Sequence, residues 1–399
     1  MIKIAILGYG TIGSGVVEVL NTNSESIAKR AGDGIEVKYI LDLRDFPGDP
    51  MEDKVIHDYD VIANDPEVEV VVEAMGGVEP AYTFVKRALL AGKNVTTSNK
   101  ALVAKHGAEL IAIAKEQNIN FLFEASVGGG IPIIRPLNSS LTADEIEEIT
   151  GILNGTTNYI LSKMTFEGLE FADVLKDAQA RGYAEADPTA DVEGYDACRK
   201  IAILTSLVCG QQVDFEDIYT EGISKITADD IKYAKAMGLV IKLLATSRKT
   251  KEGYCAMVAP FMLSQQHPLY SVNDVFNAIF VHGNVLGDAM FYGSGAGKLP
   301  TASAVVADIV DIAKHLHKNI LISWSSKKMD LVDKGRSESR FFVRSAEDKE
   351  KVQSLFGEVE FVEAPQISGE VGFLTGKMSE EEFEKKADGL NVIQRIRVV

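Results

Sequence analysis

Three glycines near the N-terminus have the spacing of a phosphate-binding loop. They lie in Gly8-Tyr9-Gly10-Thr11-Ile12-Gly13, directly after the apolar run Ile2–Leu7 and at the start of a helical pattern. In this context the first glycine permits a tight turn, the second lets the backbone approach a pyrophosphate, and the third lets helix and strand pack closely. The helix N-terminus adds free N–H groups. The loop predicts a dinucleotide site formed by Gly8, Gly10, Thr11, Ile12 and Gly13.

Two charged residues at the end of the next expected strand bear on which dinucleotide binds. Asp42 suits a free ribose 2′-hydroxyl, whereas Arg44 suits a 2′-phosphate. The residues alone therefore leave NAD(H) and NADP(H) open, and Arg44 favours NADP(H).

Asp196 and Lys200 stand four residues apart on one face of an expected helix. Such a pair is commonly an exposed salt bridge. Here the apolar run Ile201–Leu204 and Leu207 make the helix largely hydrophobic, so we expect the pair to be buried or to line a cleft.

Two further segments have residues suited to binding a small polar molecule. Thr97-Ser98-Asn99-Lys100 follows a short strand and precedes a helix, which places Lys100 at the sheet edge where open α/β folds bind ligands. A lysine there can hydrogen-bond a substrate oxygen or the nicotinamide ribose. Gly151–Tyr159 has the pattern of a strand end, a polar glycine turn and a helix start. Its amides and hydroxyls can hold a substrate or merely cap the helix, and both interpretations stay open.

The first part of the chain, to about Ser126, has the pattern of a parallel α/β sheet. Short apolar runs alternate with segments of helical periodicity. Right-handed crossovers wind such units into a doubly wound, Rossmann-type sheet. The expected strands are Ile2–Leu7, Val37–Asp42, Val68–Glu73, Val95–Thr97 and Phe121–Glu124, and the expected helices are Thr11–Leu20, Pro80–Leu90 and Lys105–Gln117.

The remainder divides into an α+β region and a small tail. The α+β region follows the three glycines 128–130, with expected helices at Tyr159–Phe166, Phe171–Ala180, Tyr195–Val208 and Ala302–Lys314 and strands at Gly238–Ser247 and Tyr254–Phe261. After the polar linker Asp333–Glu338, the tail has the βαββαβ pattern of ferredoxin-like modules. We predict a dinucleotide domain over 1–128, completed by a late helix near 300–317, a substrate domain over 129–330 and a tail domain over 339–399.

The composition excludes several classes of function. The 399 residues carry a net charge of -17, which makes the chain a poor partner for nucleic acid or an anionic membrane surface. The N-terminus has no secretory signal, so we expect a cytoplasmic protein. The three cysteines lack metal-ligand spacing and are expected as buried thiols.

Six ordered motifs resemble the homoserine dehydrogenase family over the chain up to about His317. Besides the glycine loop, they are Asn99–Leu102, Phe123–Pro132, Gly151–Tyr159, Asp187–Lys200 and the glycine-rich Gly293–Gly297 followed by Pro300–Ala304. The resemblance implies reversible reduction of L-aspartate 4-semialdehyde, a small-molecule substrate, to L-homoserine by NADPH or NADH. This step belongs to threonine, methionine and isoleucine biosynthesis.

The resemblance also implies roles for residues at matching positions. Lys200 and Lys100 would transfer the proton and orient the substrate. Glu185 and Asp196 would hold the substrate, in a pocket completed by Tyr183, Gly155, Thr156 and Asp191. Arg44, Ser98, Lys100 and Gly297 would join the glycine loop in binding the cofactor. Backbone carbonyls and one side chain among Glu124, Val127, Gly129 and Ile131 would bind a monovalent cation, Na⁺, which as a hard ion suits oxygen ligands.

The tail and the assembly are less defined by this resemblance. Family members are typically dimeric, and the strands of the middle domain are candidates for a dimerisation surface. Many end in an ACT regulatory domain, but Ser345–Lys349 lacks the Asp-x-Pro-Gly turn that shapes the amino-acid site of that domain. The tail is therefore interpreted as a degenerate ACT-like domain, which leaves threonine feedback open.

Two rival functions are distinguished by particular residues. Another Rossmann oxidoreductase, acting on a sugar or a hydroxy acid, would share the glycine loop but not the Asn154–Thr156 turn. A non-catalytic amino-acid sensor would have no reason to retain both Lys100 and Lys200.

Overall fold

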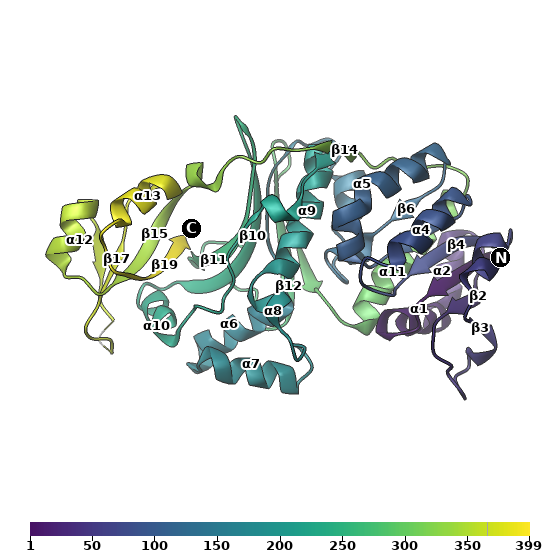
Figure 1. The fold of residues 1–399 in the computed structure, drawn as a ribbon, viewed down its shortest axis with the longest axis horizontal. Coiled ribbons are helices and arrows are strands. Elements are labelled where there is room, and N and C mark those ends of the chain that lie inside the picture. Colours follow the sequence, from purple (N-terminus) through teal and green to yellow (C-terminus); the bar gives the residue numbers. More distant parts are fainter. Residues whose placement is uncertain (365) are drawn as a thin grey trace. The chain divides into compact units, whose positions relative to one another are not determined.

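The computed structural model describes residues 1–364 and 366–399, which form two compact units (Figure 1). Unit 1 comprises Met1–Glu145, Ala202–Phe215 and Gly293–Met329, and unit 2 comprises Ile146–Ile201, Glu216–Tyr292 and Asp330–Val399. In the described ranges, no helix has both the length and the apolar character needed to cross a membrane.

Unit 1 is built on a parallel six-stranded sheet in the order β3-β2-β1-β4-β5-β6. This is the strand order of doubly wound dinucleotide-binding folds, as the sequence predicts. The central strand β4 is almost continuously buried and rich in valine, because helices cover both faces of such a sheet. The strands are β1 (Ile2–Leu7), β2 (Ile35–Leu41), β3 (Val55–Ile56), β4 (Val68–Glu73), β5 (Asn94–Thr97) and β6 (Phe121–Leu122).

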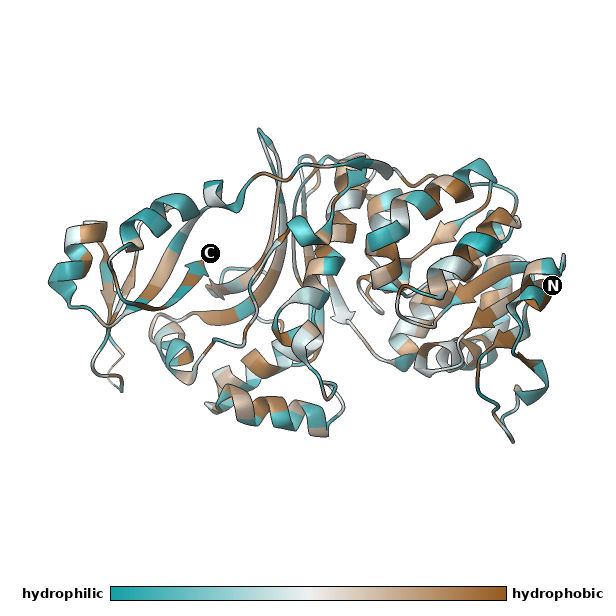
Figure 2. Cartoon of the chain, in the orientation of Figure 1, coloured by the Kyte–Doolittle hydropathy of each residue, from teal (hydrophilic) through white to brown (hydrophobic). Residues whose placement is uncertain are grey.

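Helices from distant parts of the sequence complete unit 1. The late helix α11 packs on α1, where a Cβ on Gly15 would lie only 3.0 Å from the Cβ of Ala302. Hydrophobic strands lie among helices with polar outer residues in this part of the chain (Figure 2). The helices are α1 (Thr11–Thr22), α2 (Ser24–Ala31), α3 (Tyr59–Asn64), α4 (Ala81–Leu90), α5 (Lys100–Glu116) and α11 (Lys298–Lys314), and a small separate sheet pairs β8 (Gln211–Gln212) with β14 (Ser325–Lys328).

Several boundaries in unit 1 differ from the predicted ones by one to five residues, and two of these differences have a clear cause. The predicted strand Phe121–Glu124 ends at Leu122, because the backbone N–H of Glu124 donates to the Asp308 carboxylate at 3.0 Å instead of to a neighbouring strand. The helix predicted from Lys105 begins at Lys100, because the side chain of Asn99 caps it by accepting from the N–H of Leu102.

Unit 2 contains a mixed eleven-stranded sheet whose main path is β13-β12-β7-β10-β11-β19-β15-β17-β16. Its core at β10 and β11 includes Ile152, Leu244 and Ala259. The strands are β7 (Ile146–Ile152), β9 (Tyr219–Thr220), β10 (Val240–Thr250), β11 (Gly253–Leu263), β12 (Phe276–Gly283), β13 (Gly287–Ser294), β15 (Glu338–Ser345), β16 (Glu360–Val362), β17 (Val371–Leu374), β18 (Met378–Ser379) and β19 (Val392–Val398). The helices are α6 (Gly155–Glu167), α7 (Phe171–Ala180), α8 (Thr189–Val192), α9 (Tyr195–Cys209), α10 (Ala228–Ala236), α12 (Lys349–Phe356) and α13 (Glu380–Ala387).

The C-terminal tail extends the sheet of unit 2. Its strands lie in the order β19-β15-β17-β16, and β19 pairs in parallel with β11 through Phe261 and Arg397. A second hydrophobic core, which includes Phe341, Phe373 and Phe383, lies under α12 and α13. The outer residues of α13 are hydrophilic (Figure 2). The tail therefore has its own core but shares a continuous sheet with the rest of unit 2.

Candidate active site

A buried lysine–aspartate pair lies on α9 in unit 2. The ammonium of Lys200 donates to the Asp196 carboxylate at 2.7 Å and to the backbone carbonyl of Leu153 at 2.8 Å. Lys200 is 8% exposed and Asp196 is 5% exposed. The burial agrees with the apolar pattern of the helix, and it gives this i,i+4 pair a setting unlike that of a surface salt bridge.

Asn154 connects this pair to a second aspartate. Its side-chain N–H₂ group donates to Asp191 at 2.7 Å and to Asp196 at 2.9 Å, while its side-chain oxygen caps α6 by accepting from the N–H of Thr157. One amide thus fixes the start of α6, the short helix α8 and the first turn of α9. We call Asn154, Asp191, Asp196 and Lys200 the carboxylate–lysine cluster. The sequence pattern predicts the turn without singling out Asn154, although an asparagine just before a glycine at a helix start is a recognisable signal.

The remaining predicted substrate residues of unit 2 surround the start of α6. The hydroxyl of Thr156 donates to the carbonyl of Tyr183 at 2.6 Å. A Cβ on Gly155 would lie 2.8 Å from the carbonyl oxygen of Val275, so only glycine fits there. Glu185 is exposed, and its backbone carbonyl accepts a hydrogen bond from the side-chain amide of Gln179. The structure therefore groups the cluster, Gly155, Thr156 and Tyr183, and leaves Glu185 on a more exposed segment.

Lys242, which sequence reasoning missed, is buried behind this turn. It is 2% exposed and donates to the side-chain oxygen of Asn158 at 3.0 Å, to that of Asn273 at 2.9 Å and to the carbonyl of Val272. Burial lowers its pKa to about 7. These bonds tie the first turns of α6 to the loop before β12. A single lysine inside the apolar run of β10 is the signal that would have drawn attention to it.

The glycine loop of unit 1 has the backbone geometry that the motif predicts. Gly8 has φ +92°, and a Cβ on Gly13 would lie 2.0 Å from the carbonyl oxygen of Gly8, so both positions require glycine. By contrast, the described residues leave open space beside Gly10. The helix that begins at Thr11 has glycine as its N-cap residue. Gly10 has no side-chain oxygen, so it cannot accept hydrogen bonds from the first backbone N–H groups of the helix, including that of Ile12. This arrangement suits a bound diphosphate.

A pocket of about 500 Å³ adjoins this loop and contains the predicted ribose-reading residues. The Arg44 guanidinium donates to both carboxylate oxygens of Asp42 at 3.0 Å and lies over the ring of Phe46. The N–H of Tyr9 donates to Asp42 at 2.8 Å. The Arg44 guanidinium holds the pKa of Asp42 well below its usual range. Asp42 is therefore a charged acceptor that is already paired, and Arg44 supplies a guanidinium to the lining of this pocket.

The segment between β5 and α5 is held in place by buried polar contacts. Thr97 donates its hydroxyl to the carboxylate of Glu73, and Asn99 donates its amide to the carbonyl of Gly77. Burial raises the pKa of Glu73, whose carboxylate also accepts from the N–H of Met75. These contacts place Ser98 and Lys100 at the carboxyl edge of the sheet, as the strand–helix pattern predicts.

The loop after β6 presents backbone oxygens in a constrained conformation. The carboxylate of Glu124 accepts from the N–H groups of Ile133, Ile134 and Arg135 at 2.6, 2.9 and 2.7 Å. Gly129 has φ +57°, and a Cβ there would lie 2.2 Å from the carbonyl of Gly295.

The carbonyls of Val127, Gly129 and Ile131 accept none of the hydrogen bonds found among the described residues. Gly297 lies nearby in sequence as the residue that precedes α11, with φ +115°. The described residues contain no cluster of three or more His, Cys, Asp or Glu side chains suited to a metal ion. The carbonyl oxygens of Val127, Gly129 and Ile131, which accept no hydrogen bond among the described residues, are therefore the oxygens of this loop that suit a cation.

Known families and curated relatives match most of the chain. The family described as homoserine dehydrogenase matches residues 132–310, and the homoserine dehydrogenase NAD binding domain matches residues 8–124. The homoserine dehydrogenase of Pseudomonas aeruginosa is 46% identical over 314 residues, which are 78% of this chain and 72% of that protein. That of Bacillus subtilis is 44% identical over 326 residues, or 80% of this chain and 74% of that protein.

Solved structures match the whole fold. A homoserine dehydrogenase from Thiobacillus denitrificans has a TM-score of 0.91 at 35% identity, covering 100% of this chain and 98% of that one. The S. aureus enzyme at pH 7.5 has a TM-score of 0.82 at 34% identity, with the same coverage. A hyperthermophilic archaeal homoserine dehydrogenase in complex with NADPH has a TM-score of 0.66 at 30% identity, over 78% of this chain and 97% of that one. With a dinucleotide loop in unit 1 and a carboxylate–lysine cluster in unit 2, the chain belongs to the homoserine dehydrogenase family and is an NAD(P)-dependent oxidoreductase of amino-acid biosynthesis.

Proposed function

We propose that Lys200 transfers the proton in the interconversion of L-aspartate 4-semialdehyde and L-homoserine. The observation that carries this assignment is the burial of its ammonium beside Asp196, within a cluster that Asn154 holds together. A protonated lysine stabilises the alkoxide that develops during reduction and gives it a proton, and a neutral lysine removes that proton during oxidation. The nicotinamide cofactor, when bound, supplies or accepts the hydride.

The other polar residues have binding and orienting roles in this proposal. Asp191 and Asp196 bind the amino-acid part of the substrate, together with Glu185. Gly155, Thr156 and Tyr183 shape the pocket around it, and Lys100 orients the substrate. Asn154 keeps the two aspartates in register, since its amide donates to both.

Replacing Glu185 with alanine is expected to raise the KM for homoserine by roughly tenfold or more, with a much smaller change in kcat. The carboxylate binds the substrate ammonium in the ground state and the transition state alike, so its loss weakens binding without removing the proton donor. Steady-state kinetics with saturating cofactor measure the split. Glu170, an exposed residue just before α7, provides the matched control in Glu170→Ala. An unchanged homoserine KM would remove Glu185 from the substrate site.

We also propose that NADP(H) is the preferred cofactor. The position of Arg44 supports this, because its guanidinium lines the pocket next to the glycine loop, and the Asp42 carboxylate, which would accept from a free 2′-hydroxyl, is already bonded to it. The resemblance to an archaeal enzyme in complex with NADPH gives further support. Ser98, Lys100 and Gly297 complete the cofactor contacts in this proposal.

Replacing Arg44 with alanine is expected to lower kcat/KM for NADP by roughly tenfold or more and to leave that for NAD within about twofold. A charge-assisted contact to the 2′-phosphate contributes about 1.5–3 kcal/mol, and NAD lacks this group. The ratio of the two kcat/KM values, with homoserine saturating, is the measurement. Equal losses with both cofactors would show that Arg44 does not read the 2′-phosphate.

The loop from Glu124 to Ile131 is proposed to bind a monovalent cation, Na⁺. The carbonyls of Val127, Gly129 and Ile131 lack hydrogen-bond donors among the described residues, and such oxygens suit a hard cation. The Glu124 carboxylate already accepts three backbone N–H groups, so it fixes the loop and adds negative charge. The residues present therefore fit the ion.

Four further properties complete the proposal. The protein acts in the cytoplasm as a homodimer or a higher homo-oligomer, and the strands of unit 2 are candidates for the contact between subunits. We propose the domain division that the sequence patterns predict. It comprises a dinucleotide domain over 1–128, a substrate domain over 129–330 and an ACT-like domain over 339–399. We infer that the tail is a degenerate ACT-like domain. Its element order β15-α12-β16-β17-β18-α13-β19, which is βαββαβ apart from the two-residue strand β18, supports this, as does the absence of an Asp-x-Pro-Gly turn at Ser345–Lys349.

A further inference from the structure

The segment Glu221–Asp230, which we call the connecting segment, lies between the tail and the substrate-binding cluster. It follows β9 and ends in the first turn of α10. Its first backbone N–H, that of Glu221, donates to the carbonyl of Val258 on β11 at 2.8 Å. All of these residues belong to unit 2.

The beginning of the connecting segment is held by two arginines of the tail, of which Arg397 is buried and Arg395 is partly buried. The carboxylate of Glu221 accepts from Arg397 at 3.1 Å and from Arg395 at 3.3 Å, both on β19. Both guanidiniums also bind Glu380 at the start of α13. Arg397 and Glu380 are each 0% exposed. Because charges this deeply buried need opposite charges in fixed positions, Glu221 is held in place by the tail.

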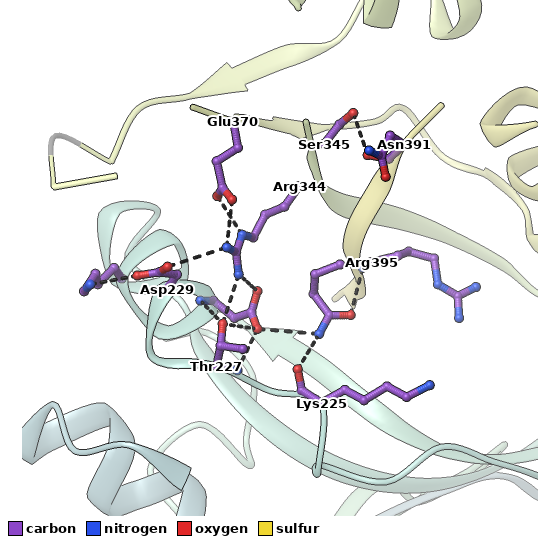
Figure 3. Close-up of polar contacts among 11 residues, drawn as sticks. Lys225, Thr227, Asp229, Arg344, Ser345, Glu370, Asn391 and Arg395 are labelled. Atoms are coloured by element: carbon purple, nitrogen blue, oxygen red, sulfur yellow. Dashed lines mark hydrogen bonds and ion pairs between the residues drawn. The ribbon is translucent and has the colours of Figure 1, made fainter. Parts of the chain in front are cut away.

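The end of the connecting segment is held by a second set of tail contacts (Figure 3). Arg344 on β15 donates to the hydroxyl of Thr227 at 3.0 Å and to the carboxylate of Asp230 at 2.7 Å, and its other nitrogens bind Glu370. Thr227 and Asp230 form the capping box of α10. Gln394 donates to the carbonyl of Lys225 at 3.0 Å. The tail therefore binds both ends of the connecting segment through ion pairs and hydrogen bonds.

The middle of the connecting segment packs closely against the turn between α8 and α9. The N–H of Ile223 donates to the carbonyl of Val192 at 2.7 Å. A Cβ on Gly222 would lie 2.2 Å from that same oxygen, so no side chain fits between the two segments. Val192 directly follows Asp191, and Gly194 leads into α9 and Asp196. Any shift of Gly222 or Ile223 must therefore move the turn that sets the spacing of the two aspartates.

We propose that the tail positions Asp191 and Asp196 for substrate through the connecting segment, with Glu221 and Arg397 as positioning residues. The proposal rests on the substrate-binding role proposed above for these two aspartates. It gives the tail a function in substrate affinity that needs no bound effector. Loss of the ion pairs between Glu221 and the two arginines moves Asp191 and Asp196 and weakens homoserine binding. The cofactor loop of unit 1 is unaffected.

The test is steady-state kinetics of the full-length Glu221→Gln variant. Glutamine keeps the shape of the side chain but loses the charge that holds the two arginines. We expect the KM for homoserine to rise roughly three- to tenfold, with kcat and the KM for NADP within about twofold of wild type. Arg397→Lys, which keeps the charge but not the planar fork, should show a smaller rise in the same direction.

Arg340→Met provides the matched control. Arg340 lies on the same strand as Arg344, but its ion pair with Glu360 and its hydrogen bond to the carbonyl of Thr375 both lie within the tail. Its homoserine KM should stay at the wild-type value. Thermal melting of every variant, followed by assay well below the lowest Tm, separates loss of fold from loss of affinity.

Two outcomes distinguish this proposal from the one on which it rests. If Asp191→Ala raises the homoserine KM but Glu221→Gln lowers only the Tm, the tail stabilises the fold without positioning the aspartates, and the inference is overturned. If Asp191→Ala leaves the homoserine KM unchanged, the substrate assignment itself fails.

Discussion

Replacing Lys200 with alanine is expected to lower kcat at least a hundredfold while the KM for homoserine stays within about threefold of wild type. A positioned general acid or base contributes roughly 10²–10⁴ in rate, and this contribution appears in the transition state rather than in substrate binding. In the structure the ammonium of Lys200 is bonded to Asp196 and to the carbonyl of Leu153, so few of its orientations are free. Initial rates of NADPH formation from homoserine measure both parameters.

Two controls make the Lys200 result specific. Lys176→Ala, at an exposed position on α7, should leave kcat unchanged. Lys200→Arg keeps a cation beside Asp196 but does not release a proton near neutral pH, so it should lose kcat nearly as fully as Lys200→Ala. Near-normal kcat in either Lys200 variant would contradict the assignment.

Replacing Glu380 with alanine is expected to lower the free energy of unfolding by about 3–5 kcal/mol. The removal of one partner from a buried ion pair leaves charge uncompensated, and here the guanidiniums of Arg395 and Arg397 would be left to share the single carboxylate of Glu221. One nitrogen of Arg397 is already buried without a hydrogen-bond partner among the described residues, so this side chain has no spare acceptor to replace Glu380. Urea denaturation followed by circular dichroism measures the change in midpoint.

Glu384→Ala is the matched control for this prediction. Glu384 lies on the same helix but forms an exposed ion pair with Lys334, so its replacement should cost less than about 1 kcal/mol. Similar shifts for the two variants would show that the Glu380 network is not what holds the tail to the rest of unit 2.

The dinucleotide fold could be predicted because its signals are local. A glycine loop after β1 and apolar strands separated by helical patterns are enough to specify the parallel sheet. The polar helix α10 gives no comparable signal, since its apolar positions are few and its start depends on the capping box of Thr227 and Asp230. The parallel pairing of β11 with β19 joins residues that are far apart in sequence, and nothing local in either strand specifies it.

The candidate site was partly predictable for the same reason. An apolar helix carrying Asp196 and Lys200 already indicates a buried charged pair. The bridge that Asn154 makes between Asp191 and Asp196, and the burial of Lys242 behind α6, depend on strands and turns brought together by the tertiary fold. These residues therefore become recognisable only when the neighbouring elements are in place.

The most direct test of the proposed activity is a spectrophotometric assay of the purified protein with homoserine, a panel of sugars and a panel of 2-hydroxy acids, each with NADP and with NAD. We expect reduction of the cofactor with homoserine, and rates at least a hundredfold lower with every other substrate and with Lys200→Ala. Comparable rates with a sugar or a 2-hydroxy acid, or the absence of any cofactor reduction with homoserine, would contradict it.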